Sequence, residues 1–275
     1  MPLRKERRAQ SRGPLSVYAN PIYAALRASA GKTDSLVGAI GIFLVVGLIV
    51  AVAGTGLFVM LAGHVRSGTT QAFDESVLRW LGAHHTSALD ATMVEITALG
   101  TTAVVMMIVA VAALFLVLTE HKYSAILLLA STAGGIVLDG VLKLGFNRPR
   151  PTVFVPEVHV VSSSFPSGHA MSSAIVYTTV AFLAARLHKR EWARWLVMIV
   201  AFIVIAAISF SRLYLGVHYP SDVLAGIAIG LAWAGFCMAI LEAIQKYVFR
   251  TAPQKSGEPA LPGKSPGRTE SSSRH

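Results

Sequence analysis

The feature that most constrains the fold is a set of six long apolar runs, each close to the length that spans a lipid bilayer. The first run, residues 36–62, contains no charged side chain. Five further runs follow it, at residues 99–118, 123–146, 169–187, 195–213 and 222–243. An α-helix rises about 1.5 Å per residue, so roughly 20 residues cross the ~30 Å hydrocarbon core. Because the runs show no polar–apolar alternation, they predict an all-α polytopic membrane protein with six transmembrane helices.

Composition excludes an ordinary soluble enzyme. Hydrophobic residues make up 54% of the chain and charged residues 14%, whereas soluble proteins carry about 25% charged residues. The single cysteine, Cys237, lies in an apolar run, which excludes an internal disulfide and a cysteine-based metal site. The formal net charge is +10, but its distribution between apolar runs indicates a membrane orientation and not nucleic-acid binding.

The apolar runs divide the chain into three regions. Residues 1–35 form a basic N-terminal segment, and residues 36–245 form the membrane domain. Residues 246–275 form a tail rich in Pro, Gly, Ser and charge, which we expect to be disordered. The run 36–62 is too long for the core of a signal peptide, so we interpret it as a retained anchor.

The connection between the first two runs, residues 64–98, is long and mixed in character. Its stretch 73–83 has apolar positions at helical spacing beside charged ones. This pattern predicts a short helix that lies along the membrane interface, with Trp80 at the depth of the lipid headgroups.

Lys and Arg residues predict the orientation. With the N-terminus inside, most of the 24 Lys and Arg residues fall on inner segments, and cytoplasmic segments of membrane proteins are enriched in these residues. The remaining ones are Arg66, Arg79, Lys143, Arg148, Arg150 and Arg212. We therefore expect both termini in the cytoplasm.

Three polar clusters interrupt the apolar background. The first closes the third run at residues 143–151 (KLGFNRPRP), and the second opens the fourth at residues 165–169 (FPSGH). The third joins the fifth and sixth runs at residues 211–222 (SRLYLGVHYPSD). Counting membrane crossings from a cytoplasmic N-terminus places all three clusters on the outer side. The sequence therefore predicts one extracytoplasmic site built from these segments.

The clusters contain groups that bind a polyanion. Lys143, Arg150 and Arg212 supply three cations at the membrane boundary, where an unpaired charge is costly. Ser167 and Gly168 stand at the start of a predicted helix, where backbone N–H groups and the helix dipole favour phosphate oxygens. These five residues are our candidates for phosphate binding.

The same clusters contain groups for acid–base and nucleophilic chemistry. His169 and His218 can divide the roles of acid and nucleophile. Asp222, four residues after His218, can hold the imidazole tautomer and stabilise positive charge on the ring. Together with the cations, these residues describe phosphoryl transfer without a metal ion or another cofactor.

The three blocks read Lys-x6-Arg-Pro, Pro-Ser-Gly-His and Ser-Arg-x5-His-x3-Asp. In this order and on this side, they resemble the motifs of the type 2 phosphatidic acid phosphatase (PAP2) superfamily, which includes vanadium haloperoxidases and glucose-6-phosphatase. The resemblance covers residues from about 36 to 245. It implies that His218 attacks phosphorus, that Asp222 orients His218, and that His169 protonates the leaving oxygen and later activates water.

The resemblance also implies a lipid substrate and a place in the inner (cell) membrane of a bacterium. A polyprenyl diphosphate such as undecaprenyl diphosphate, a phosphatidylglycerophosphate and phosphatidic acid all remain candidates. The residues leave two alternatives open. One is a phosphotransferase that passes the phosphoryl group to a lipid or sugar, and the other is a lipid transporter or scrambler. The oligomeric state stays open.

Several polar residues outside the blocks receive structural interpretations. Asp139 lies four residues before Lys143, so we expect an ion pair that positions the lysine. We assign Arg148 to the protein surface or to contact with lipid headgroups, and not to the site. His84 and His85 are interpreted as loop residues because no further metal ligand stands nearby at a suitable spacing. The glycines near 134 and 226–230 favour close helix packing.

Overall fold

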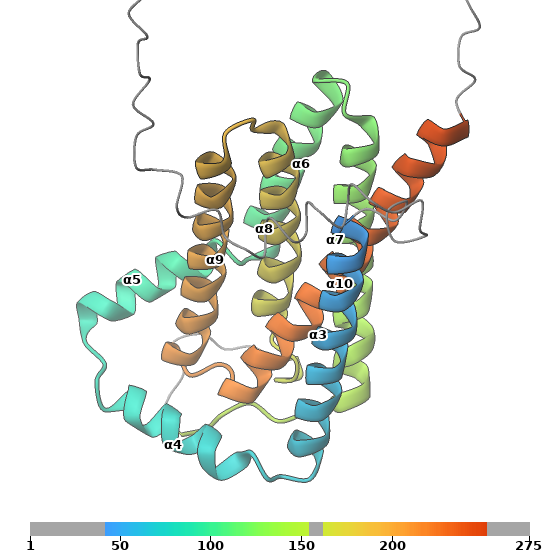
Figure 1. The fold of residues 1–275 in the computed structure, drawn as a ribbon. Coiled ribbons are helices and arrows are strands. Elements are labelled where there is room, and N and C mark those ends of the chain that lie inside the picture. Colours follow the sequence, from blue (N-terminus) through green and yellow to red (C-terminus); the bar gives the residue numbers. More distant parts are fainter. Residues whose placement is uncertain (1–41, 154–161, 252–275) are drawn as a thin grey trace, which may run out of the picture.

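The structure is a computed structural model that describes residues 42–153 and 162–251. Within these ranges the regular elements are all helices (Figure 1). They are α3 (Ile42–Arg66), α4 (Gln71–Gly82), α5 (Ser87–Ala98), α6 (Thr102–Leu118), α7 (Lys122–Phe146), α8 (Gly168–Leu187), α9 (Glu191–Tyr214) and α10 (Pro220–Thr251). The predicted segment 1–35 lies outside the described residues.

In the described part of the chain, five helices are long and apolar enough to cross a membrane: α3, α7, α8, α9 and α10. They correspond to five of the six predicted runs. The remaining run, residues 99–118, is only partly the single helix that the sequence predicts. Helix α6 begins at Thr102 and forms a candidate span together with α5, which meets it at a 45° bend. Thr101 has an extended backbone (φ −69°, ψ 150°), so the helix cannot continue through it.

Helix α4 confirms the short helix predicted at 73–83. Leu78 and Leu81 on one face are buried against Tyr214 and Tyr219, while Trp80 on the other face is exposed. Full burial of a Leu side chain contributes about 1.5–3 kcal/mol relative to exposure to water. This apolar face therefore fixes α4 against the end of the helical bundle.

Two boundaries differ from the sequence-based prediction. Helix α5, within the predicted loop 64–98, was missed, although Thr86 supplies a cap by accepting a hydrogen bond from the Leu89 backbone N–H at 3.3 Å. Helix α10 continues to Thr251, past residue 245 where we expected disorder to begin. No Gly or Pro occurs between Ala243 and Thr251, so nothing in the backbone stops the helix there.

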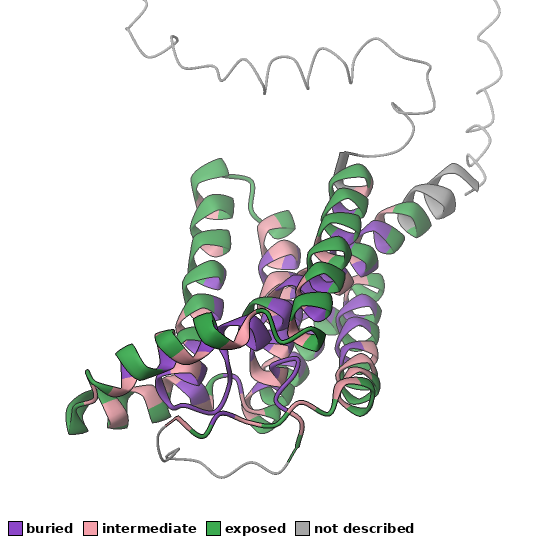
Figure 2. Cartoon of the chain, turned by 90° about the horizontal axis from the view of Figure 1, so that it is seen from below, coloured by how far each residue is buried: buried purple, intermediate pink, exposed green. Residues whose placement is uncertain are grey.

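The membrane helices form one bundle, in which α10 packs against both α3 and α8. Glycines let α3 approach α10: a Cβ atom on Gly47 would lie 2.6 Å from the Gly235 carbonyl oxygen. Figure 2 shows exposed outer faces on the helices and buried loops at one end of the bundle. At that end α7 and α9 finish and α8 and α10 begin (Figure 1).

Candidate active site

The three polar clusters meet at this end of the bundle because the chain turns sharply there. Asn147 adopts a left-handed backbone conformation (φ 42°) that ends α7, and the prolines that follow keep the chain extended. Gly216 has φ 66° in the turn between α9 and α10, a conformation that favours glycine. Pro220 then opens α10 in the first helical position, where its missing N–H costs nothing.

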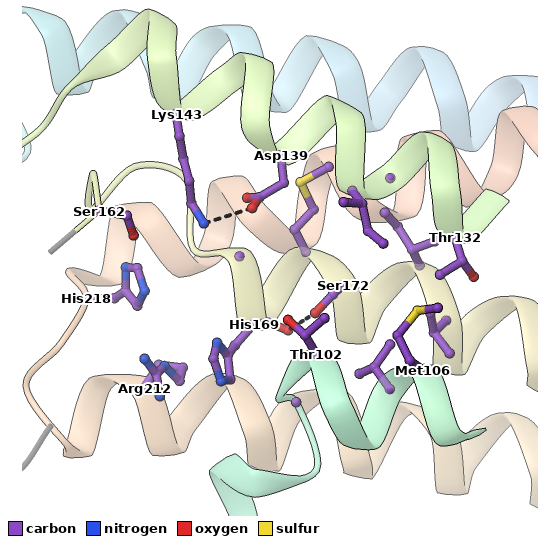
Figure 3. A pocket seen from close by; sticks show the side chains of 18 of the residues that line it. Thr102, Met106, Thr132, Asp139, Lys143, Ser162, His169, Ser172, Arg212 and His218 are labelled. Atoms are coloured by element: carbon purple, nitrogen blue, oxygen red, sulfur yellow. Dashed lines mark hydrogen bonds and ion pairs between the residues drawn. The ribbon is translucent and has the colours of Figure 1, made fainter. Parts of the chain in front are cut away.

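A cavity of about 270 Å³ lies between the helix ends. Six of the eight predicted site residues line it, and Figure 3 shows the side chains of four of them, Lys143, His169, Arg212 and His218, around a common space. The six are Lys143, Arg150, Gly168, His169, Arg212 and His218. The cavity continues along an apolar wall that α6, α7 and α8 provide, with lining residues that include Val105, Met106, Ile136, Ile175 and Val176. One end is therefore cationic and the other hydrocarbon-like.

The contacts of His218 define which ring nitrogen faces the cavity. Nδ1 lies 2.8 Å from the Ser164 carbonyl oxygen, which only accepts hydrogen bonds, so Nδ1 carries the proton. Nε2 then keeps its lone pair, 3.4 Å from the Arg150 guanidinium. Burial lowers the pKa of His218 from 6.5 to about 4, although Asp222 opposes that shift. The ring is therefore neutral at pH 7.

Asp222 lies behind His218 and does not line the cavity. Its Oδ2 is 3.7 Å from His218 Nδ1, which is beyond hydrogen-bond distance. Oδ2 instead accepts hydrogen bonds from the Ser164 hydroxyl and from the Tyr219 backbone N–H at 2.9 Å. Asp222 thus contacts the same residue, Ser164, whose carbonyl fixes the imidazole. The orienting contact that the resemblance implies runs through Ser164 in this structure.

Arg148 is not at the lipid surface, and our interpretation of it was wrong. Its side chain is only 9% exposed and forms ion pairs with both Asp74 and Asp222. Its guanidinium carbon also lies 4.2 Å from the centroid of the Tyr219 ring. The sequence did not indicate this position because the carboxylate partners lie far away along the chain.

Arg150, in the segment after α7, and Arg212 of α9 both line the cavity. Arg150 is held by the Val217 carbonyl oxygen at 2.7 Å and the Ser162 carbonyl oxygen at 2.8 Å, and burial lowers its pKa. Arg212, near the end of α9, is buried and donates to the Thr97 hydroxyl at 2.9 Å. Its Nε has no hydrogen-bond partner among the described residues. Buried donors of this kind are normally satisfied, so Arg212 has capacity for an anionic ligand.

Lys143 forms the expected ion pair with Asp139, at 2.8 Å between Nζ and Oδ2. This pair packs closely against the start of α8. A Cβ atom on Gly168 would lie 2.7 Å from Lys143 Nζ and 3.2 Å from the Asp139 carboxylate. Position 168 therefore has to be glycine for the lysine to reach this place.

Ser167 and His169 flank that glycine, but only His169 lines the cavity. Ser167 is fully buried and does not line the cavity, and its backbone N–H donates to the Asp222 carbonyl oxygen at 3.0 Å. Its hydroxyl has no partner among the described residues. His169 points into the cavity beside Arg212 (Figure 3). The backbone N–H groups available at this helix start are therefore those that follow Ser167.

His84 and His85 lie in the connection between α4 and α5, as predicted, and the structure adds a packing contact for His85. Its ring stacks on Tyr214 with centroids 4.2 Å apart, and its Nδ1 lies 3.2 Å from Asp90. His84 is exposed and lies against Trp80.

Known proteins share both the sequence pattern and the fold. The sequence profile of the PAP2 superfamily matches residues 124–246, which contain the three clusters. Phosphatidylglycerophosphatase B of Bacillus subtilis is 32% identical over 175 residues, which are 63% of this chain and 86% of that protein. Undecaprenyl-diphosphatase of Sulfolobus acidocaldarius is 34% identical over 137 residues, which are 48% of this chain and 62% of that protein.

A solved structure agrees with these sequence matches. The crystal structure of a transmembrane PAP2 type phosphatidylglycerolphosphate phosphatase from Bacillus subtilis superposes with a TM-score of 0.66 and 27% identity. The match covers 74% of this chain and 98% of that one. The chain is a membrane lipid phosphatase of the PAP2 superfamily.

In this PAP2 phosphatase, several residues outside the motifs contact the site and were missed from the sequence. Besides Ser162 and Ser164, which precede the second block, two come from α4 and α5. Asp74 of α4 pairs with Arg148, and Thr97 of α5 holds Arg212. A weak signal existed for Asp74, since it is an acidic residue beside the apolar face of an amphipathic helix. Thr97 carried no signal, because a threonine in a mixed segment is compatible with many environments.

Proposed function

We propose that this PAP2 phosphatase releases phosphate from a lipid phosphate monoester or diphosphate through a phosphohistidine intermediate. One observation carries the proposal: the unprotonated Nε2 of His218 faces a cavity that it shares with His169 and three cationic side chains. A neutral imidazole with its lone pair towards bound phosphorus is a nucleophile that needs no further activation.

The reaction has two steps. His218 Nε2 forms a bond to phosphorus while the bond from phosphorus to the lipid oxygen breaks, and His169 gives its proton to that oxygen. A water molecule then attacks phosphorus, His169 takes a proton from it, and the phosphorus–nitrogen bond breaks. The products are the dephosphorylated lipid, inorganic phosphate and neutral His218. Each histidine thus returns to its starting state.

Charge complementarity supports phosphate binding at the polar end of the cavity. Arg150, Arg212 and Lys143 line this end together with Gly168 and His169, the first residues of α8, where backbone N–H groups without a helical partner favour phosphate oxygens. These groups stabilise the charge that develops on the phosphoryl oxygens in the transition state. We propose that they act without a metal ion.

The apolar wall of the cavity supports a lipid substrate. Met106 of α6 and Ile136 of α7 line the cavity and are 43% and 52% exposed, so the apolar part of the cavity is open and not enclosed. A headgroup in the cavity can therefore leave its hydrocarbon chain in the bilayer. The names of the relatives favour phosphatidylglycerophosphate or undecaprenyl diphosphate, and phosphatidic acid is a further candidate. We propose that the site faces the extracytoplasmic side.

Phosphate release from purified protein in detergent tests this function. The panel contains phosphatidylglycerophosphate, undecaprenyl diphosphate, phosphatidic acid and p-nitrophenyl phosphate, with and without EDTA. We expect the amount of phosphate released to equal the amount of lipid that loses a phosphate. We also expect vanadate to inhibit the reaction and EDTA to have no effect on it. A shortfall of phosphate with a phosphorylated acceptor indicates a transferase. Activity that EDTA removes and a divalent ion restores contradicts the metal-free mechanism.

A further inference from the structure

A buried carboxylate from α4 lies next to the catalytic cluster. Asp74 of α4 has no exposed surface. Its Oδ1 accepts the Ser221 backbone N–H at 3.0 Å, and its Oδ2 accepts the Arg148 guanidinium at 2.9 Å and the Ser221 hydroxyl. Figure 1 shows α4 across the end of the bundle where α10 begins. Helix α4 therefore contacts the first turn of α10.

Arg148 connects Asp74 to the carboxylate behind the nucleophile. Its NH1 donates to Asp222 and to the Ser221 hydroxyl, while its NH2 donates to Asp74 and to Gln71 at 3.1 Å. One guanidinium thus lies between two buried carboxylates. With one positive and two negative groups, this chain of charges has a net charge of one negative unit.

That net charge matters for the chemistry of His218. When Nε2 bonds to phosphorus, Nδ1 keeps its proton and the ring becomes cationic. Asp222 lies 3.7 Å from Nδ1, close enough for its charge to stabilise the cationic ring. Arg148 alone would cancel the charge of Asp222. Asp74 restores the negative charge, because it neutralises Arg148 from the other side.

We propose that Asp74 is a positioning residue of the phosphohistidine site. Through Arg148 it keeps Asp222 in place and keeps the charge behind His218 negative. This inference rests on the proposed phosphohistidine mechanism. Asp74 itself touches neither substrate nor the reacting nitrogen, so its effect appears in the rate of phosphoryl transfer and not in substrate binding.

The test replaces Asp74 by the isosteric amide and then restores the charge at a neighbouring position. We expect Asp74→Asn to lower kcat about 10–100-fold, less than removal of an orienting carboxylate itself, with KM within about threefold. Gln71 contacts the same guanidinium nitrogen. The double variant Gln71→Glu/Asp74→Asn regains the negative charge, and we expect its kcat to lie within about tenfold of wild type.

The matched control is Glu95→Gln, an acid-to-amide change on an exposed position of α5. It should leave kcat, KM and the melting temperature unchanged. A merely structural role of Asp74 would lower the melting temperature in both variants and would give no charge rescue. Gln71→Glu does not restore the oxygen by which Asp74 accepts the Ser221 hydroxyl, so the lost contact would stay lost. Wild-type kcat in Asp74→Asn overturns the proposal.

The double variant and a phosphoenzyme assay distinguish a failure of the Asp74 role from a failure of the phosphohistidine mechanism. If Asp74→Asn is too unstable to purify, the double variant decides: a kcat more than tenfold below wild type overturns the inference. Trapping of 32P-labelled phosphohistidine in wild type, and its loss in His218→Ala, tests the proposed function by itself. A wild type that forms no phosphoenzyme contradicts that function. A normal phosphoenzyme together with an unaffected Asp74→Asn contradicts only the role of Asp74.

Discussion

At the scale of single residues, the two histidines of the cavity differ in what surrounds them. His218 is 2% exposed, and its Nδ1 is fixed by a backbone carbonyl. His169 is half-buried at the start of α8, and no hydrogen bond joins its ring to another described residue. A fixed tautomer suits a nucleophile, whereas a ring that no hydrogen bond holds can turn towards the leaving oxygen, as a proton donor and acceptor must. This difference leads to a test that separates the two roles.

The importance of His169 in the first step should depend on the leaving group. A lipid alkoxide needs a proton to leave, whereas p-nitrophenolate departs as a stable anion. General acid catalysis contributes about 10²–10⁴-fold. We therefore expect His169→Ala to lose most lipid turnover but to release an initial burst of nitrophenolate from p-nitrophenyl phosphate, followed by slow hydrolysis. Rapid-mixing absorbance measurements would detect the burst.

His218→Ala is the control for this experiment. Because His218 forms the bond to phosphorus, its replacement should abolish turnover of both substrates, and it should remove the burst from the His169→Ala background. A burst that survives without His218 would show that another residue is the nucleophile. Equal impairment of both substrates in His169→Ala would show that His169 is not the proton donor.

At the scale of helices, the sequence predicts elements well where an unbroken apolar run decides them. Helices α3, α7, α8, α9 and α10 follow from such runs, and α4 follows from its amphipathic period. Helix α5 was missed because its sequence, SALDATMVEITA, has neither a long apolar run nor a clear apolar face. Its place depends on tertiary contacts with α9, which local patterns do not encode.

The residues of the site also fall into those that local sequence predicts and those that depend on tertiary contacts. Lys143, His169, Arg212 and His218 belong to short segments with fixed spacing, so the sequence and the count of membrane crossings bring them together. Asp74 and Thr97 reach the site only because α4 and α5 fold back onto it. The burial of Arg148 was missed for the same reason: a sequence shows the charge of a residue but not its distant partner.

The contact between α7 and the start of α8 gives a prediction at this scale. Gly168→Ala places a methyl group 2.7 Å from Lys143 Nζ, so the lysine or the helix has to move. Misplacement of a catalytic group by about 1 Å costs roughly 10²-fold in rate. We expect Gly168→Ala to lower kcat/KM by about 10–100-fold, with a melting temperature near that of wild type.

Gly140→Ala is the matched control for this change. A Cβ atom at Gly140, on the same helix as Lys143, meets no atom within 4 Å in the described part of the chain, apart from its sequence neighbours and its own helix backbone. Alanine is the better helix former, so this variant should keep its activity and its stability. If Gly168→Ala retained full activity, the close packing of the lysine against α8 would have no catalytic importance.

At the scale of the whole molecule, the structure sharpens the argument for orientation. Among the described residues, the end of the bundle with the site contains Arg66, Arg79, Lys143, Arg148, Arg150 and Arg212. The last four belong to the site or pair with its carboxylates. Arg66 and Arg79 are then the cations of that end with no part in the site. The opposite end contains Lys122, Arg186, Lys189, Arg190 and Arg194, so the positive-inside bias is stronger than the bare sequence suggests.

Single cysteines at the two ends test this orientation. Cys237 is buried in α10 and is the only cysteine of the chain, so Cys237→Ala supplies a background without thiols. His84, beside α4, and Lys189, between α8 and α9, are both exposed. We expect a membrane-impermeant maleimide to label the His84→Cys variant on intact spheroplasts, and to label the Lys189→Cys variant only after permeabilisation. The reverse pattern would place the cavity on the cytoplasmic side and exclude an extracytoplasmic lipid phosphate as the substrate.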